Sequence, residues 1–286
     1  MVEIPAGVSV SRDGPTDAWE KGVLFAPGNS TVVLRADHCS GAKGVMNAGA
    51  DELEIIGSDA DCAYLPDRDA RMHYRLAMSL DVQRYEQLLE RGWRRFGRTL
   101  FRPVCRTCSE CRSLRIDVPA FQATRSQRKA QRRNADLKVI VQRPTVTDEH
   151  VDLYNSYHQD MQQRRGWPFQ KISEDQYYES FLDGQFSFSR EFQYRRDGQL
   201  VALGIVDMTG TAMSSIYFIH LPELRKNSPG TMSVLHELRV GRETGHRWLY
   251  MGYYIADCGS MNYKNRFHPH QMLQHYADDH EPAVWQ

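Results

Sequence analysis

The sequence predicts an α+β fold, and three observations support this. Segments whose apolar residues recur with a helical period are separated by short runs rich in β-branched and aromatic residues. Between residues 191 and 220, Asp-Gly and Thr-Gly dipeptides separate such runs, which is typical of β-hairpins. Hydrophobic residues make up 41% of the 286 residues, enough for a sizeable core, and no apolar run is long enough to predict a membrane span.

Residues 1–57 differ in composition from the rest of the chain. They contain eight of the twenty glycines and only two aromatic residues, Trp19 and Phe25. This composition predicts a loosely ordered extension with one strand at Ser30–Arg35. A basic stretch followed by an apolar one is missing, so no secretory signal is expected. Six cysteines in a chain of this length do not indicate a disulfide scaffold, and we expect a cytoplasmic protein.

A smaller, cysteine-containing domain is predicted over residues 58–143. Its first helix is expected at Ser79–Arg91, where apolar side chains share one face and Gly92 suits the position after the helix end. The segment that follows mixes β-formers with glycine, proline and cysteine, as short strands and loops do. A second helix is expected at about Ala123–Asn134.

The remaining residues, 144–286, predict hairpins followed by a helix and a further strand. A helix is expected to start near Asp148, and strand–turn–strand patterns begin at Glu191. A loop at 221–230, a helix at Thr231–Thr244 and a strand at 247–254 follow. Hairpins, then a helix, then another strand are the order of an acyltransferase domain of the GNAT type, the GCN5-related N-acetyltransferases. We therefore expect a GNAT-like domain here.

Positive charge is concentrated in one segment of a chain whose formal net charge is zero. Between Arg84 and Arg133, fourteen Arg or Lys residues stand against four acids. Five of these cations share one stripe of the second predicted helix: Arg125, Arg128, Lys129, Arg132 and Arg133. Like charges at this spacing repel one another, and the phosphates of a nucleic acid would relieve the repulsion. We predict nucleic-acid contact here, extended by Arg94, Arg95 and Arg98; a solvated basic face is the alternative.

Three cysteines fall within seven residues in a C-x2-C-x2-C pattern. They are Cys105, Cys108 and Cys111, with Cys62 upstream as a candidate fourth ligand. Thiolates at this spacing commonly hold zinc or an iron–sulfur cluster in a reducing compartment. The triple is denser than the usual pairs of a zinc ribbon, so small interior side chains are the alternative to a metal site.

The loop before the last predicted helix bears on the choice of acyl donor. GNAT enzymes bind the pyrophosphate of coenzyme A with a [RQ]-x-x-G-x-[GA] turn at a helix N-terminus. Here residues 225–230 read RKNSPG, so Arg225 and Gly230 fit. Ser228 replaces the first glycine, and Pro229 removes an amide donor. The loop therefore favours an acyl carrier other than coenzyme A.

Five segments together resemble a known family. The first three are CAYLPDRDAR at 62–71, GWRRFGRTLFRPVCRTCSECRSLRI at 92–116 and RSQRKAQRRNADL at 125–137. The others are SSIYFIHLPELRKNSPGTMSVLHEL at 214–238 and WLYMGYYIADCGSMNYKNRFHP at 248–269. They resemble the bacterial aspartate/glutamate leucyltransferases, which are related to the eukaryotic arginyltransferases. The resemblance covers residues 58–275, although S-P-G-T stands where the family usually reads S-L-G-T.

The resemblance implies an aminoacyl-tRNA–protein transferase of the N-degron pathway. The acceptor would be a protein that begins with Asp or Glu, and Leu-tRNA is favoured over Arg-tRNA as the donor. The acceptor's α-amine would attack the ester carbonyl of the charged tRNA directly. Because an ester is already activated, no cofactor is required, and positioning and electrostatics should dominate. A coenzyme A-dependent N-acetyltransferase and a non-catalytic RNA-binding protein are the rival interpretations.

The implied reaction needs residues in three roles. Candidates for binding the acidic acceptor are Arg68, Arg75, Tyr263 and Lys264. Candidates for handling the amine proton are Asp207, Tyr217 and Asp257. Candidates for holding the ribose and the aminoacyl group are Ser214, Ser215, Gly230, Thr231, Tyr253 and Tyr254. Each has a structural alternative: Asp207, for example, could cap a hairpin and Tyr217 could pack in a sheet.

Overall fold

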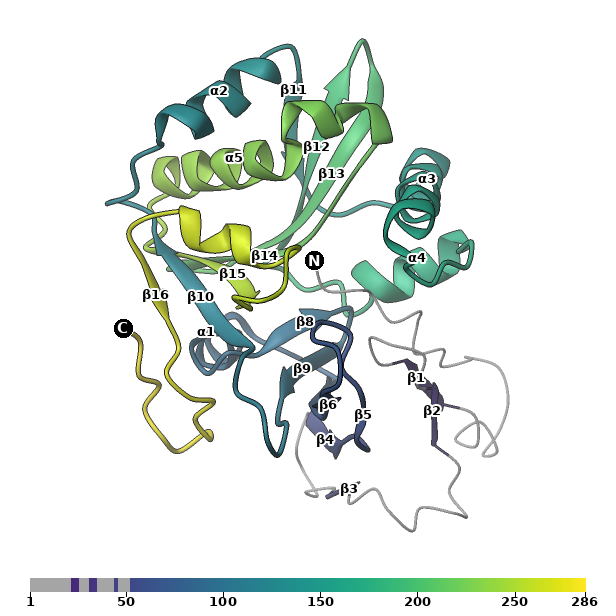
Figure 1. Ribbon diagram of the computed structural model, residues 1–286, viewed down its shortest axis with the longest axis vertical. Helices are drawn as coiled ribbons and strands as arrows, with labels where there is room; N and C mark the ends of the chain where they lie inside the picture. The colour runs from purple at the N-terminus through teal and green to yellow at the C-terminus, as the bar shows by residue number, and fades with distance from the viewer. Residues whose placement is uncertain (1–21, 26–30, 35–43, 46–51) are drawn as a thin grey trace.

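The computed structural model describes residues 52–286 and three short strands of the N-terminal extension (Figure 1). Those strands are β1 (Gly22–Phe25), β2 (Thr31–Leu34) and β3 (Gly44–Val45). The strand expected at Ser30–Arg35 is confirmed by β2, which pairs antiparallel with β1. The prediction of a loosely ordered extension falls mainly on residues outside the described ones.

The N-terminal part is built on an antiparallel sheet of five strands. Their order is β3, β4 (Glu52–Ile56), β7 (Met72–Ala77), β9 (Thr99–Pro103) and β8 (Arg94–Phe96). A short ribbon of β5 (Ala60–Asp61) and β6 (Asp69–Ala70) lies between β4 and β7 in the chain. The expected first helix is confirmed as α1 (Val82–Glu90), which begins where the Asp81 carboxylate accepts a hydrogen bond from the Arg84 amide.

The larger sheet has seven strands. Their order is β11 (Lys138–Gln142), β12 (Ser189–Arg196), β13 (Gln199–Met208), β14 (Ala212–His220), β15 (Trp248–Tyr254), β10 (Arg112–Asp117) and β16 (His270–Met272). Neighbours are antiparallel except β14 and β15, which are parallel and are joined through α5 (Pro229–Glu243). Hairpins, a helix and a further strand therefore follow in the expected GNAT-like order, and the α+β prediction is confirmed.

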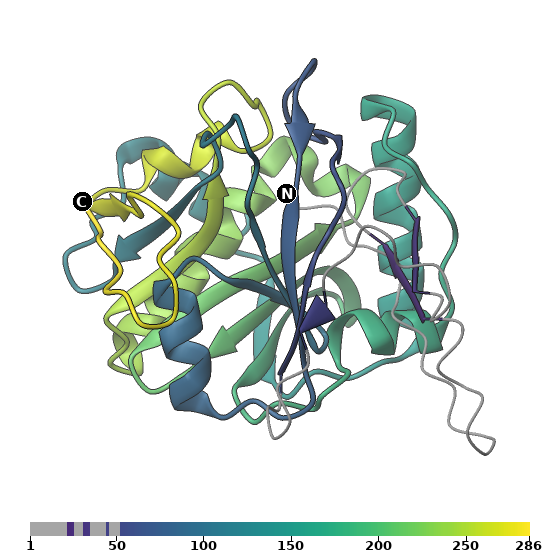
Figure 2. The same ribbon diagram turned by 90° about the horizontal axis from the view of Figure 1, so that it is seen from below.

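Helices cover both faces of this sheet. Along β13, Leu203 and Ile205 pack on the face covered by α3 (Asp148–Arg165), whereas Ala202 and Val206 pack on the face covered by α5. In Figure 1 and, turned by 90°, in Figure 2, α3 and α4 (Glu174–Phe181) lie away from α2 (Arg125–Arg133) and α5. The seven-stranded sheet therefore lies between two separately packed layers of helices.

Two elements differ from the sequence-based expectation. The segment at 221–230 is not wholly a loop, because it contains the 3-10 helix η2 (Pro222–Asn227). Helix α5 starts at Pro229 rather than at Thr231, since proline suits the first helical position, where no amide donor is needed. A second 3-10 helix, η3 (Asn262–Arg266), follows β15. Among the described residues, no helix combines the length and apolarity that crossing a membrane requires.

Candidate active site

Strands β14 and β15 separate partway along their length. Their parallel pairing covers three positions, from Ala212↔Trp248 to Ser214↔Tyr250, yet β14 continues to His220 and β15 to Tyr254. We call the region between residues 215–220 and 251–254 the fork. Backbone groups that lose their ladder partners need other hydrogen bonds, so a fork inside a sheet is suited to binding side chains or a ligand.

The side chain of Arg94 bridges the two strands at the start of the fork. Its Nη1 donates to Ser214 Oγ at 2.7 Å, and its Nη2 donates to the Ser215 carbonyl. On the other strand Gly252 has a φ of +72°, and a Cβ there would lie 2.9 Å from Arg94 Nε. Arg94 is 5% exposed, and no carboxylate of the described residues forms an ion pair with it. A buried cation without a counter-ion is costly, which is typical of a site that receives negative charge from a ligand.

Helix α5 places a buried carboxyl group near Arg94. Glu237 is 1% exposed, and its Oε1 accepts a hydrogen bond of 2.9 Å from Ser233 Oγ, one turn earlier. Oε2 has no hydrogen-bond partner within the described part of the chain. Burial raises the pKa of Glu237 to about 7, although Ser233, Ser215 and Arg94 favour the charged form. This carboxyl group therefore changes its charge near neutral pH.

The 3-10 helix η3 supplies two further groups. Lys264 is 5% exposed, and its Nζ donates to the Tyr253 carbonyl at 2.6 Å. Burial and, to a smaller extent, the charge of Arg94 lower the pKa of Lys264 to about 7. Tyr263 is half-buried, and burial together with the nearby Glu237 raises its pKa to about 12. Elements β8, β14, α5 and η3 thus converge on one polar cluster at the fork.

A cationic surface lies beside α5. Thr124 and Gln127 form a capping box that begins α2, and the five cations of its stripe are all exposed. Across the part of the chain that the structure describes, none of the five forms an ion pair. A groove of about 490 Å³ between α2 and α5 is lined by Arg128, Arg132 and Arg239 among others. The charge of this surface is therefore available to a polyanion.

Comparison with known proteins gives the family. Residues 60–129 match the N-terminal sequence profile, and residues 149–274 the C-terminal profile, of arginine-tRNA-protein transferases. An aspartate/glutamate leucyltransferase of Helicobacter hepaticus is 32% identical over 82% of this chain and 97% of its own length. One of Campylobacter jejuni is 34% identical over 78% of this chain and 93% of its own length. The chain belongs to this family of aminoacyl-tRNA–protein transferases.

Solved structures align with the chain more loosely. The alignment with the crystal structure of FemX covers 74% of this chain and 80% of the FemX chain, at 9% identity and a TM-score of 0.39. A tandem GNAT protein from the clavulanic acid biosynthesis pathway covers 56% of this chain, and 51% of that chain is covered, at 16% identity and a TM-score of 0.35.

Several residues predicted for the transferase site lie at or beside the fork. Ser214 and Ser215 contact Arg94, the Tyr253 carbonyl accepts from Lys264, and Tyr263 lies near Glu237. The Tyr253 hydroxyl donates to the Phe101 carbonyl, whereas the Tyr254 hydroxyl accepts from Asn265 Nδ2. Gly230 and Thr231 form the half-buried first turn of α5, and a Cβ at Gly230 would meet open space.

Two of the predicted proton-handling residues lie outside the polar cluster, although Tyr217 belongs to the segment of β14 that borders the fork. The Tyr217 hydroxyl is hydrogen-bonded to His158 Nε2 at 2.6 Å, and Tyr217 packs in the core on the α3 face of the sheet. Burial lowers the pKa of His158 to about 4, so this imidazole is neutral at physiological pH. Asp257 is exposed in the turn after β15. Neither residue belongs to the polar cluster at the fork.

The roles expected for Asp207, Arg94 and Arg95 need correction. Asp207 and Arg95 are buried and form an ion pair with each other, so the Asp207 carboxylate is already engaged and Arg95 is not at the surface. Arg94 is buried at the fork instead of extending the basic surface. Arg98 is half-buried, and its guanidinium is paired with Asp183 at 2.9 Å. The exposed stripe of α2 is therefore not continued by these three arginines.

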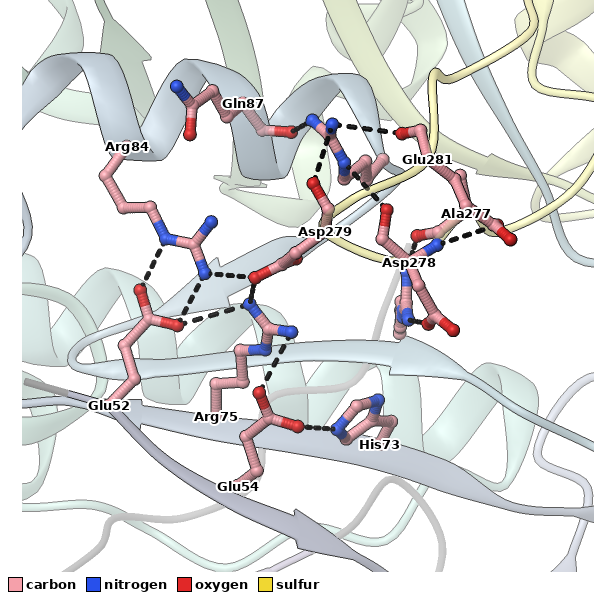
Figure 3. Close-up of polar contacts among 12 residues, drawn as sticks. Glu52, Glu54, His73, Arg75, Arg84, Gln87, Ala277, Asp278, Asp279 and Glu281 are labelled. Atoms are coloured by element: carbon pink, nitrogen blue, oxygen red, sulfur yellow. Dashed lines mark hydrogen bonds and ion pairs between the residues drawn. The ribbon is translucent and has the colours of Figure 1, made fainter. Parts of the chain in front are cut away.

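The expectation that Arg75 binds the acceptor also needs correction. Figure 3 shows its guanidinium among the carboxylates of Glu52, Glu54 and Asp279, at 3.2, 3.0 and 2.9 Å. Arg84 shares Glu52 and Asp279, and the whole cluster ties the C-terminal segment to the five-stranded sheet. The positive charge of Arg75 is thus already balanced by neighbouring carboxylates. Arg68, by contrast, is exposed in the turn between β5 and β6.

The four cysteines proposed as metal ligands are half-buried thiols in the N-terminal part. Burial, with smaller contributions from the other three cysteines, raises the pKa of Cys111 to about 12, so the four thiols are near neighbours. Cys105 instead exchanges hydrogen bonds with the backbone of Arg71. Within the described ranges, no three His, Cys, Asp or Glu side chains are arranged to hold a metal ion. This arrangement does not fit a zinc or cluster site.

Glu237 was missed when the sequence alone was considered, although a signal was present. Helix α5 is buried on most of its circumference, so its few polar residues lie in the interior. Ser233 and Glu237 are one turn apart on such a helix, which allows their side chains to meet. A polar pair inside an otherwise apolar helix, directly after the loop at 225–230, could have indicated a functional carboxyl group.

Proposed function

We propose that the chain transfers leucine from Leu-tRNA to the N-terminus of proteins that begin with Asp or Glu. Membership of the family and the names of the relatives support this reaction. One observation carries the proposal from the structural side. Helix α5 packs against the cationic helix α2 and also carries the carboxyl group at the fork, so a surface suited to RNA adjoins the polar cluster that we propose as the reaction site.

The reaction needs an uncharged α-amine, an ester carbonyl and a low-dielectric site. The amine nitrogen forms a bond to the ester carbon, whose carbonyl oxygen becomes an oxyanion. The intermediate then collapses, the bond to the ribose oxygen breaks, that oxygen gains the proton that the amine loses, and a peptide bond remains. Amides in the first turn of α5, at Gly230 and Thr231, are suited to stabilising the oxyanion or the ribose, because a helix N-terminus favours negative charge. We propose no cofactor for this step, since the ester is already activated.

The acidic side chain of the acceptor needs a cation that is not already paired. Arg94 meets this condition and is buried, where an ion pair is strengthened by the low dielectric. Lys264 and Tyr263 lie in the same cluster and remain candidates for the same role, and Arg68 remains one for an outer contact. Ser214, Ser215, Tyr253 and Tyr254 are retained as residues that shape the aminoacyl site.

The donor is proposed to lie along α2. Phosphates of the tRNA would contact the stripe formed by Arg125, Arg128, Lys129, Arg132 and Arg133. The 3′ end would then reach the fork past the first turn of α5. Charged tRNAs are cytoplasmic, so we place the reaction there and propose that the products enter the N-degron pathway.

A single experiment tests donor, acceptor and reaction together. The protein and a mixture of charged tRNAs are incubated either with a peptide that has an N-terminal Asp or with a control peptide that starts with Ala. The masses of the products are then measured by mass spectrometry. A gain of one leucine residue on the Asp peptide alone is expected. A gain of one arginine residue would favour the second candidate, an arginyltransferase, which is the activity named by the matching family profiles.

Two further arms separate the rival interpretations. Acetyl-coenzyme A replaces the charged tRNAs in the first, and acetylation of the peptide would identify a coenzyme A-dependent enzyme. The second measures binding of uncharged tRNA by the same preparation. Tight tRNA binding with no change in the mass of either peptide would identify an RNA-binding protein without catalytic activity.

A further inference from the structure

We propose that Glu237 is the catalytic residue that takes a proton from the attacking α-amine and returns a proton to the ribose oxygen that leaves. This inference rests on the proposed function and names the residue that handles the proton.

The first support is an unpaired oxygen in a buried polar cluster. Glu237 Oε1 accepts from Ser233 Oγ, and Ser233 Oγ in turn accepts from the Tyr194 hydroxyl at 3.3 Å. These two hydrogen bonds, which link β12 to α5, fix the orientation of the carboxyl group. Oε2 has no partner within the described residues, and a buried acceptor left unpaired destabilises the folded protein. An N–H group of a bound amine would supply the missing hydrogen bond.

The second support is the charge of the surroundings. Arg94 of β8 and Ser215 of β14 favour the charged form of Glu237. Glu237 in turn raises the pKa of Tyr194 of β12 and of Tyr263 of η3, so both tyrosines lie close to it. Arg94 is the charged member of this set. With a pKa of about 7, Glu237 is close to the usual value of about 7.7–8.0 for a protein α-amine. Transfer of a proton between the two is therefore nearly balanced, which suits a general base.

The third support is that the other candidates are already engaged. Asp207 is paired with Arg95, and Tyr217 is bonded to His158 on the α3 face. Lys264 donates to the Tyr253 carbonyl, and its pKa responds to burial and to the charge of Arg94 before it responds to Cys258 and Cys111. Glu237 thus contributes an acceptor atom without a partner to the cluster that contains Arg94.

The step balances without any additional reactant. As the nitrogen–carbon bond forms, an N–H proton of the amine passes to Glu237 Oε2, and the carbonyl oxygen takes the electron pair. As the tetrahedral intermediate collapses, the carbon–oxygen bond to the ribose breaks, and the ribose oxygen takes the proton from Glu237. The carboxylate is regenerated for the next turnover.

The test compares Glu237→Gln with Glu243→Gln, which makes the same change at an exposed position near the end of the same helix. Glutamine keeps the shape and the bond to Ser233 but cannot accept the proton. We expect kcat for leucyl transfer to the Asp peptide to fall by about 100-fold or more in Glu237→Gln. The KM values for peptide and Leu-tRNA should change little, and Glu243→Gln should behave like the wild type.

A second variant excludes a purely structural role. Glu237→Ala removes the carboxyl group and leaves space for a small one, so added formate should restore part of kcat, whereas sodium chloride at the same concentration should not. Equal kcat in Glu237→Gln and wild type would overturn the inference while leaving the proposed function intact. So would a Glu237→Ala protein that folds but gains nothing from formate. A wild-type chain that transfers no amino acid would remove the proposed function and this inference together.

Discussion

Arg95 and Asp207 form a bidentate ion pair that is almost completely buried. The two contacts are Nη2–Oδ1 at 2.6 Å and Nε–Oδ2 at 3.0 Å, and the side chains are 1% and 0% exposed. Ser189 Oγ donates a further hydrogen bond to Asp207 Oδ1. Because Arg95 lies on β8 and Asp207 on β13, the pair joins the five-stranded sheet to the seven-stranded one. Its role is to hold the two sheets together.

Asp207→Asn should therefore lower stability more than it lowers transfer per folded molecule. Breaking a buried pair leaves an uncompensated guanidinium, so the free energy of unfolding should fall by about 3–5 kcal/mol, as measured by urea denaturation. Asp183→Asn is the matched control, because Asp183 pairs with Arg98 at a half-exposed position and should cost about 1 kcal/mol or less. Equal losses in the two variants would contradict the structural role of the pair.

The arginines illustrate how much of the site the sequence determines. Arg95 and Arg128 both occur in strongly basic segments, and spacing along the chain does not separate a buried arginine from an exposed one. For Arg128 the helical period was sufficient to predict an exposed position, since all five cations share one exposed face. For Arg95 the deciding partner is Asp207, more than a hundred residues away, and only the packing of the two sheets brings them together.

The elements themselves were more predictable. Helices at 82–90 and 148–165 match the expectation because their apolar periods and the glycines at their ends are local signals. The helix at 125–133 matches because the spacing of its cations and its capping box are local as well. Helix α4 was not predicted, although Ser173 and Gln176 form a capping box at its start. Lys264 was singled out, but its burial depends on the fold around the fork. Local chemistry thus predicts elements, whereas burial decides which polar residues form the site.

Reversing the charge of Arg128 and Arg132 should weaken tRNA binding. Each phosphate contact releases a counter-ion when tRNA binds, and a variant that loses two contacts releases fewer. The slope of the logarithm of the binding constant against the logarithm of salt concentration should therefore become shallower by about 1.5–2 for the double Glu variant. Fluorescence titration of tRNA at several salt concentrations measures this slope. The control replaces Arg165 and Lys171, two exposed cations in and after α3, by Glu. It makes the same change of net charge and should leave the slope unaltered. A common slope for both variants would remove α2 as the phosphate site.

Lys264→Met should change how stability depends on pH. In the wild type the pKa of Lys264 is lowered from 10.5 to about 7, so between these values the unfolded chain holds a proton that the folded chain has released. Stability attributable to this residue then rises with pH by about 1.4 kcal/mol per unit in that range and is lost as pH falls to 7.

Methionine removes the titration, so the difference in unfolding free energy between wild type and variant should increase from pH 7 to pH 9 in urea melts. Lys171→Met, at an exposed position, should give a difference that does not vary with pH. A constant difference for Lys264→Met as well would mean that Lys264 stays charged in the folded protein.

Gly252→Ala should impair transfer through its contact with Arg94. Gly252 and Gly245 both have positive φ, +72° and +80°, so alanine strains the backbone at either position by about 1 kcal/mol or more. At Gly245 a Cβ meets nothing within 4 Å, whereas at Gly252 it would lie 2.9 Å from Arg94 Nε. Both variants should therefore lose stability, but only Gly252→Ala should displace the guanidinium that spans the fork. Its KM for the Asp peptide should rise clearly above that of Gly245→Ala, and indistinguishable KM values would argue that Arg94 does not bind the acceptor.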